Sequence, residues 1–361
     1  MISKISIENY KSIETCELDF SKINVLIGPN GSGKTSVLEC FEVLRKFSNR
    51  IRSFTNIKPS RRIRVDNISV KTSFKAHGEV PFQFDQIVFK KELNRKIKIK
   101  FKFDNLPLLE TELTFDENVG VARIIGKDLS TQELVRYPLN ILFILRTERK
   151  IDRILRGALY EVKNVDTHNA HQLFFYTCYR SEFKENIQLI KNFFSKYGQS
   201  DIRWVPLPDG VTYKIVATNE IGVDVDINDM GSGFIALFPL IVPLAFYPKS
   251  SSIFIEHPEM HLHPRLQYEL SKFLLEMSEK RNYQLFLETH SEHILFGFLN
   301  AVARRELKNS DLTIYAVRKI DGISSFEKLK IYEDGSVEGG LQEFLEPDLD
   351  EFADWLRVWM E

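Results

Sequence analysis

The sequence predicts an α/β fold with a mixed central sheet, an antiparallel β subdomain and an inserted helical subdomain. Apolar strands alternate with helical segments from Ile253 to Val317, which is typical of parallel β/α units. Residues 67–125 are rich in Val, Ile, Phe and Thr with a period of two, which predicts an antiparallel sheet. From about Thr131 to Tyr197 the pattern becomes helical.

The N-terminal elements follow the same reasoning. Ile2 to Ile7 alternates apolar and polar residues, as does the stretch around Leu18 to Phe20, so strands are expected there. Ile23 to Ile27 is continuously apolar and ends in glycine, which is typical of a buried central strand. A helix is expected from Gly33 to about Phe47. Further along, VTYKIVA and VDVDI predict two strands, and Phe234 to Tyr247 predicts a buried helix too short to span a membrane.

The composition is that of an ordinary soluble protein. Apolar residues make up 43% and charged residues 27% of the 361, with a formal net charge of −1. No overall attraction to nucleic acid or to an anionic membrane follows from that charge. Locally, residues 45–64 and 90–102 are basic, whereas the last thirty or so are acidic. Phe47 and Phe54 interleave with the first basic segment, which is read either as solvated surface or as a DNA contact. The acidic end would either dock on the body or offer Trp355 and Trp359 to a partner.

Cysteine usage and the N-terminus indicate a cytoplasmic protein. Cys16, Cys40 and Cys178 form neither a metal spacing nor a disulfide framework, which fits a reducing compartment. The first residues lack the apolar core of a signal peptide, and no segment is expected to cross a membrane.

A phosphate-binding loop is the strongest motif in the chain. Residues 28–35, GPNGSGKT, match GxxxxGK[ST] directly after an apolar strand and before a helix. The backbone N–H groups of such a loop and the helix N-terminus surround phosphates. Lys34 would reach the β- and γ-phosphates of ATP, and the Thr35 hydroxyl would ligate Mg²⁺. A plain glycine-rich turn is the alternative. The expected nucleotide-binding residues here are Asn30, Gly31, Ser32, Gly33, Lys34, Thr35 and Ser36.

Two later strands end in polar residues suited to the same chemistry. The apolar strand ending at Glu256 has the form of a Walker B element, whose carboxylate holds Mg²⁺ directly or through water. His290 follows the apolar strand that begins at Gln284, and it could sense the γ-phosphate or stabilise the transition state. An ordinary strand-end acid and a structural histidine are the alternatives.

Taken together, GPNGSGKT, NDMGSGF, IFIEHPEMHLHP and ETHSEHIL resemble the Walker A, signature, Walker B with D-loop, and switch-histidine motifs of ABC-type ATPases. The sequences of these motifs are similar to those of the small prokaryotic SMC-like group related to OLD-family and Septu-type defence ATPases. This resemblance implies a P-loop NTPase fold of the ABC/SMC-head type. It divides the chain into an N-terminal ATPase lobe (1–130), a helical insertion (131–205) and a C-terminal ATPase lobe (206–361).

The resemblance also implies a head-to-tail homodimer. Gly231, Ser232 and Gly233, preceded by Asp229, match the loop that closes on ATP bound to the other protomer. A simple helix N-cap is the alternative. His257 stands where ABC ATPases usually have a catalytic glutamate, so His257 and Glu259 are the candidate general bases. Without either base, the protein would be a slow ATP-gated switch.

The remaining histidine pairs are weaker signals. His261 and His263 lie within the expected D-loop, Glu259 to His263, where a structural or interfacial role is favoured over a metal. His168 and His171 are read as a polar helix face.

Three functions are compatible with these motifs. The first is an SMC-like ATPase that controls a partner effector, such as a nuclease in anti-phage defence, because the chain has no Toprim-like or HNH-like pattern of its own. The others are a DNA-binding repair or recombination ATPase and a transporter subunit, the last disfavoured by the lack of a convincing LSGGQ.

Overall fold

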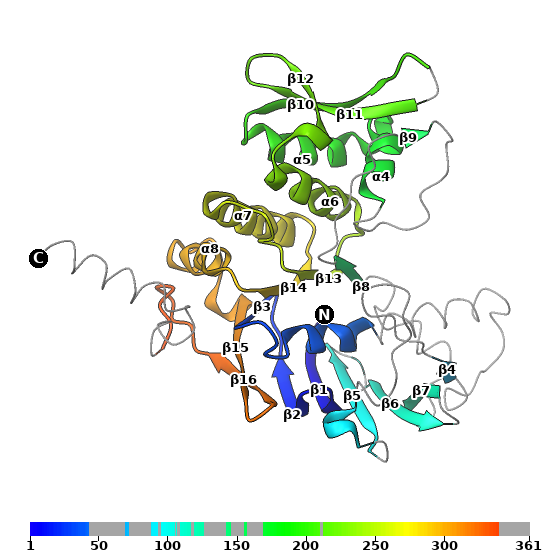
Figure 1. Cartoon of the computed structure of the whole chain (residues 1–361). Coiled ribbons are helices and arrows are strands. Elements are labelled where there is room, and N and C mark those ends of the chain that lie inside the picture. The colour runs from blue at the N-terminus through cyan, green and yellow to red at the C-terminus, as the bar shows by residue number, and fades with distance from the viewer. Residues whose placement is uncertain are drawn as a thin grey trace, which may run out of the picture. The chain divides into compact units, whose positions relative to one another are not determined.

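The computed structural model describes residues 1–42, 69–71, 88–92, 95–104, 106, 109–116, 119–125, 142–145, 155–156, 169–209 and 212–338. They form two compact units (Figure 1). The first comprises Met1–Leu142 with Phe286–Glu361, and the second comprises Phe143–Leu285. The basic segment 45–64, His168, Trp355 and Trp359 lie outside the described residues.

The first unit contains a six-stranded antiparallel sheet (Figure 1). Its strand order is β2 (Ile13–Asp19), β1 (Ile2–Tyr10), β5 (Ile97–Phe103), β6 (Leu109–Asp116), β7 (Val119–Ile125) and β4 (Ser69–Lys71). The antiparallel sheet predicted within 67–125 is confirmed. The two N-terminal strands join it through β1, which pairs with β5.

The charges of β5 follow from the pleat of the strand. Ile97, Ile99 and Phe101 are fully buried, whereas the lysines between them are at least partly exposed. The Nζ of Lys98 lies 3.5 Å from a carboxylate oxygen of Glu8 on the neighbouring strand. This part of the basic stretch 90–102 is therefore the polar face of a half-buried strand.

The first unit contains strands of a second sheet, in the order β16 (Ile323–Leu329), β15 (Leu312–Ile320), β3 (Ile23–Ile27) and β14 (Gln284–Thr289). Every residue of β3 is buried, as its apolar run predicts, and β3 pairs in parallel with β15. Residues 34–42 are helical directly after the loop that follows β3. Helix α8 (Glu292–Ala303) connects β14 with β15.

In the second unit the strand order continues from the start of β14 through β13 (Ser252–Glu256) to β8 (Leu142–Leu145). The backbone N–H of Gln284 donates to the carbonyl oxygen of Ser251 at 2.9 Å. Helix α7 (Pro264–Lys280) connects β13 with β14, so the predicted strand–helix alternation is confirmed.

The rest of the second unit packs helices against a small antiparallel sheet (Figure 1). Strands β10 (Gln199–Pro206), β11 (Thr212–Asn219) and β12 (Asp224–Asp226) form it, and β9 (Leu155–Arg156) pairs with β11. Helices α4 (Ala170–Thr177), α5 (Lys184–Ser195) and α6 (Ser232–Phe246) contribute buried residues to the core of this part of the unit. The helical structure expected between Thr131 and Tyr197 is wrong for residues 142–145 and 155–156, which form strands β8 and β9. Short apolar runs do not distinguish a strand from a buried helix.

Helix α6 is apolar on all sides, and ten of its residues are buried. The ring centroid of Phe238 lies 5.4 Å from that of Phe174 on α4 and 6.2 Å from that of Phe194 on α5. A helix that is hydrophobic all round belongs in a protein core. None of the helices in the described ranges is long and apolar enough to cross a membrane.

Candidate functional site

The loop after β3 requires glycine at two positions because neighbouring segments approach its backbone. Gly28 has φ 151°, and a Cβ there would lie 2.1 Å from the carbonyl oxygen of Val317 on β15. Gly33 has φ 112°, and a Cβ there would lie 2.2 Å from the Oγ of Ser324 on β16. The glycines of the motif therefore serve the packing of the loop as well as its curvature.

Two serines far apart in the sequence support this loop from outside. The Ser324 hydroxyl donates to the carbonyl oxygen of Ser32 at 2.6 Å and lies 2.7 Å from the Ser12 hydroxyl. The backbone N–H of Ser324 donates to the carbonyl oxygen of Ser12 at 2.8 Å. This cluster could not be predicted from the sequence, because an isolated serine carries no pattern.

Lys34 and Thr35, the two side chains of the loop expected to contact phosphate and Mg²⁺, are both held by hydrogen bonds. Lys34 is 2% exposed, and its ammonium donates to the carbonyl oxygens of Gly28 at 2.8 Å and Pro29 at 2.9 Å. The Thr35 hydroxyl donates to Oε1 of Glu288 at 2.5 Å, and Glu288 is 1% exposed. Glu288 was missed by sequence reasoning, although an acid inside the apolar strand β14 was a usable signal.

His290 follows β14 in a turn that is fixed on both sides. The Thr289 hydroxyl accepts a hydrogen bond from the backbone N–H of Ser291 at 2.9 Å. The Ser291 hydroxyl in turn accepts from the N–H of Ile294 at 3.0 Å and so caps helix α8. The position of the histidine backbone is therefore determined by the end of the strand and the start of the helix.

In the second unit, Glu256 is the last residue of β13 and is 2% exposed. His257 follows with φ 42°, a left-handed conformation that reverses the chain after the strand. Its Nδ1 lies 3.6 Å from Oε1 of Glu259, and the two side chains are 27% and 14% exposed. The two candidate bases are thus neighbours at the end of one strand.

The expected D-loop and signature loop also belong to the second unit and pack together. A Cβ on Gly233 would lie 3.3 Å from the Leu266 side chain and 3.6 Å from the carbonyl oxygen of His261. The His263 imidazole caps α7, because its Nδ1 accepts from the N–H of Arg265 at 3.3 Å. Gly231 is the N-cap of α6, which begins at Ser232.

The predicted site residues are therefore divided between the units. The first unit holds the loop with Lys34 and Thr35, and also His290; the second holds Glu256, His257, Glu259 and residues 231–233. Glu288, which was not predicted, belongs to the first unit. No cluster of three or more His, Cys, Asp or Glu side chains within the described residues is arranged to hold a metal. The Thr35 hydroxyl and the Glu288 carboxylate are nevertheless the hard oxygen donors that Mg²⁺ prefers, and Mg²⁺ usually takes its other ligands from water and substrate phosphates.

Residues 23–295 match the model of a protein family described as "AAA domain, putative AbiEii toxin, Type IV TA system". The chain belongs to this family of AAA ATPase domains.

Three curated relatives add to the comparison. The AAA ATPase is 22% identical over 340 residues to an OLD nuclease of Thermus scotoductus, which covers 86% of this chain and 62% of the relative. Over 58 residues it is 45% identical to a DNA double-strand break repair Rad50 ATPase of Methanopyrus kandleri, covering 16% of this chain and 6% of the relative. Over 44 residues it is 50% identical to the DNA replication and repair protein RecF of Vibrio campbellii, covering 12% of each.

Solved structures agree with the predicted fold class. The AAA ATPase matches the SMC head domain of Thermotoga maritima with a TM-score of 0.50 and 13% identity, over 91% of this chain and 99% of that one. It matches an Smc head domain from Pyrococcus furiosus, bound to the C-terminal domain of ScpA, with a TM-score of 0.53 and 12% identity over 99% of both chains. The ABC/SMC-head type of P-loop fold is thereby confirmed.

Proposed function

We propose that this AAA ATPase binds ATP with Mg²⁺, hydrolyses it slowly, and uses the cycle as a head-to-tail homodimer to control an effector, a nuclease of an anti-phage defence system. The observation that carries the proposal is the loop in which buried Lys34 and half-buried Thr35 stand at the start of a helix, with the Glu288 carboxylate bonded to Thr35. Lysine and threonine in this position bind phosphates and Mg²⁺.

The dimer in this proposal follows from the signature loop. Gly231 to Gly233 form the start of α6, where backbone N–H groups are available to an anion. In ABC-type ATPases the corresponding loop completes the ATP site of the other protomer, as the motif resemblance implies. Glu256 is assigned to Mg²⁺ on its motif alone.

The slow rate follows from the replacement of the usual catalytic glutamate by His257. Loss of a positioned base costs about 10²–10⁴ in rate. A neutral imidazole is a modest replacement, even with Glu259 3.6 Å away. ATP would then serve to hold the dimer in one state rather than to supply rapid turnover.

The nuclease effector is inferred from the OLD relative and from the resemblance to Septu-type defence ATPases. The chain spans 62% of that nuclease and contains no recognisable nuclease pattern. The proposal assigns the cutting chemistry to a partner and its control to this ATPase, by analogy with the defence group that the motifs resemble.

Lys34→Ala tests the assignment of the nucleotide site. The variant should bind a fluorescent ATP analogue at least about tenfold more weakly, because a hydrogen bond from a charged donor contributes roughly 1.5–3 kcal/mol. Lys4→Ala is the control, since Lys4 is a surface lysine paired with Glu17 in the same unit. Equal affinity of the Lys34 variant and the wild type would remove the loop from the site.

A DNA repair or recombination ATPase is the second candidate, favoured by the local identity to Rad50 and RecF. Direct DNA binding through basic residues would weaken steeply with salt. ATP-stimulated, salt-dependent binding of duplex DNA by the purified chain would favour this candidate over the control of a separate nuclease.

A further inference from the structure

One face of strand β14 packs against the helix that follows the phosphate loop. The ring centroid of Phe286 lies 4.9 Å from that of Phe20 and 5.3 Å from that of Phe41. Phe41 belongs to the helical residues 34–42. Side chains two residues apart on a strand share a face. Glu288 therefore points to the same side as Phe286, which places its carboxylate at the start of this helix, where Thr35 stands.

Burial makes the Glu288 carboxylate a costly feature that packing alone does not explain. The side chain is 1% exposed, and every other residue of β14 is buried as well. A carboxylate in such a place is strongly destabilising unless hydrogen bonds or a cation compensate for its lost hydration. An apolar residue at position 288 would pack at lower cost, so the acid indicates a ligand or a positioning role.

The direction of the hydrogen bond decides what the Thr35 oxygen can do. A threonine hydroxyl has one proton and two lone pairs. Its proton is directed to Oε1 of Glu288 at 2.5 Å, which leaves the lone pairs available to a cation. A hydroxyl that instead pointed its proton at the ion could not serve as a ligand.

We propose that Glu288 is a positioning residue for Mg²⁺: it holds the Thr35 hydroxyl with its lone pairs toward the ion and adds a negative charge next to that oxygen. This role rests on the proposed ATPase function. Partners of metal ligands fix the ligand orientation, and their loss costs about 10–100-fold in metal affinity.

The test separates nucleotide binding from its Mg²⁺ dependence. The affinity for a fluorescent ATP analogue is measured in excess EDTA and over a MgCl₂ series for wild type, Glu288→Gln, Thr35→Val and the double variant. In EDTA, Glu288→Gln should bind within about twofold of wild type, whereas the MgCl₂ concentration needed for half of the full effect should rise about 10–100-fold. The loss in the double variant should be much smaller than the product of the single losses, because both substitutions act on one oxygen.

A second readout is Mn²⁺ in place of Mg²⁺. Electron paramagnetic resonance of free Mn²⁺ in the presence of ATP should show weaker uptake by Glu288→Gln than by wild type. Glu17→Gln is the matched control, because Glu17 is an exposed acid of the same unit, paired with Lys4. If Glu288→Gln does not fold, Glu288→Asp, which keeps the charge but shortens the reach, replaces it in the same series.

Three results would overturn the proposal: unchanged Mg²⁺ dependence in Glu288→Gln, an equal loss of affinity with and without Mg²⁺, or fully multiplicative losses with Thr35→Val. The equal loss would mean that Glu288 only maintains the loop. If wild-type protein bound the analogue in neither condition, the proposed ATPase function itself would fail, and this role with it.

Discussion

His257 combines an unusual backbone with an unusual neighbour. Its φ of 42° turns the chain sharply after β13, and the carbonyl oxygen of His257 accepts from the N–H of Met260 at 3.2 Å. The turn brings Glu259 back to within 3.6 Å of the imidazole. A carboxylate beside one ring nitrogen leaves the other nitrogen as an acceptor for a proton. The pair therefore offers two alternative bases at one place.

His257→Ala and Glu259→Gln distinguish these bases. If His257 accepts the proton from water, turnover should fall as the pH is lowered and the imidazole becomes protonated, because imidazolium cannot accept a proton. His257→Ala should then lower the rate by about 10²-fold or more and abolish that limb of the pH profile. A large loss only in Glu259→Gln would assign the base to the carboxylate. Wild-type rates in both variants would mean that neither side chain activates the water.

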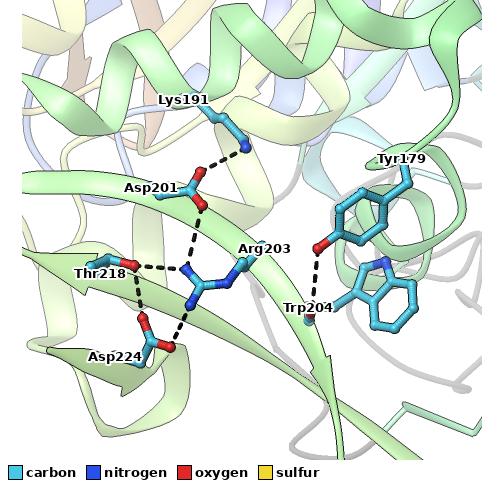
Figure 2. A network of polar contacts seen from close by, with 7 residues as sticks. All are labelled: Tyr179, Lys191, Asp201, Arg203, Trp204, Thr218 and Asp224. Carbon is cyan, nitrogen blue, oxygen red and sulfur yellow. Dashed lines mark hydrogen bonds and ion pairs between the residues drawn. The ribbon is translucent and has the colours of Figure 1, made fainter. Parts of the chain in front are cut away.

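At the scale of elements, one arginine cross-links the strands of the small sheet of the second unit (Figure 2). The Arg203 guanidinium on β10 donates to the Thr218 hydroxyl at 2.8 Å and pairs with Asp201 at 3.4 Å and Asp224 at 2.5 Å. The Lys191 ammonium on α5 lies 2.6 Å from the other oxygen of Asp201. The network thus links three strands and a helix.

The charge of Asp201 makes the network sensitive to acid. Burial opposes its ionisation, but Lys191, the backbone N–H of Ile202 and Arg203 together outweigh that effect and lower the pKa of Asp201. A lowered pKa in the folded state stabilises the protein above the unfolded value of about 3.9. This contribution is lost as the pH falls through the folded pKa, so the network should weaken below about pH 4.

Arg203→Met should therefore cost about 1 kcal/mol at pH 7, because the ion pairs are about one-third exposed and solvent screens them. The loss should appear as faster amide hydrogen exchange in β11 and β12 and should shrink at pH 3. Lys280→Met is the control, since Lys280 forms a single surface pair with Glu276 and should change stability by a few tenths of a kcal/mol. Unchanged exchange in Arg203→Met would show that backbone pairing alone holds the sheet.

At the scale of the whole molecule, the two units carry different parts of the proposed chemistry. The first holds Lys34 and Thr35, and the second holds the signature residues 231–233. Ser232 is exposed at the first turn of α6. A large cationic side chain at this position would obstruct the phosphates of ATP bound to a second protomer, without altering the loop that contains Lys34.

Mixing two inactive variants tests the head-to-tail dimer. Lys34→Ala and Ser232→Arg should each abolish turnover alone, and their mixture should regain activity. In a mixed dimer, one of the two sites combines an intact phosphate loop with an intact signature loop. The measurement is ATP turnover against the mixing ratio, with mixed dimers verified by differential tags. Verified mixed dimers without activity would exclude head-to-tail pairing.

The sequence by itself determined the elements whose signal is local. The phosphate loop is encoded in eight consecutive residues, because glycines, a lysine and a threonine at those spacings specify both the backbone and its chemistry. The buried strand β3 and the strand–helix alternation from β13 to β15 follow from apolar periodicity in the same way. The SMC-head fold could be predicted from the order of these motifs.

The tertiary structure alone decided which distant residues support the loop. Glu288 bonds to Thr35 across 253 positions, and Ser324 bonds to Ser32 across 292. It also decided that β1 pairs with β5, and that residues 142–145 form a strand rather than a helix. Local propensity and periodicity describe only neighbours along the chain, whereas these contacts depend on how strands pair and on which face of β14 meets the helix. For that reason the sequence identified the phosphate loop but not the buried carboxylate that holds its threonine.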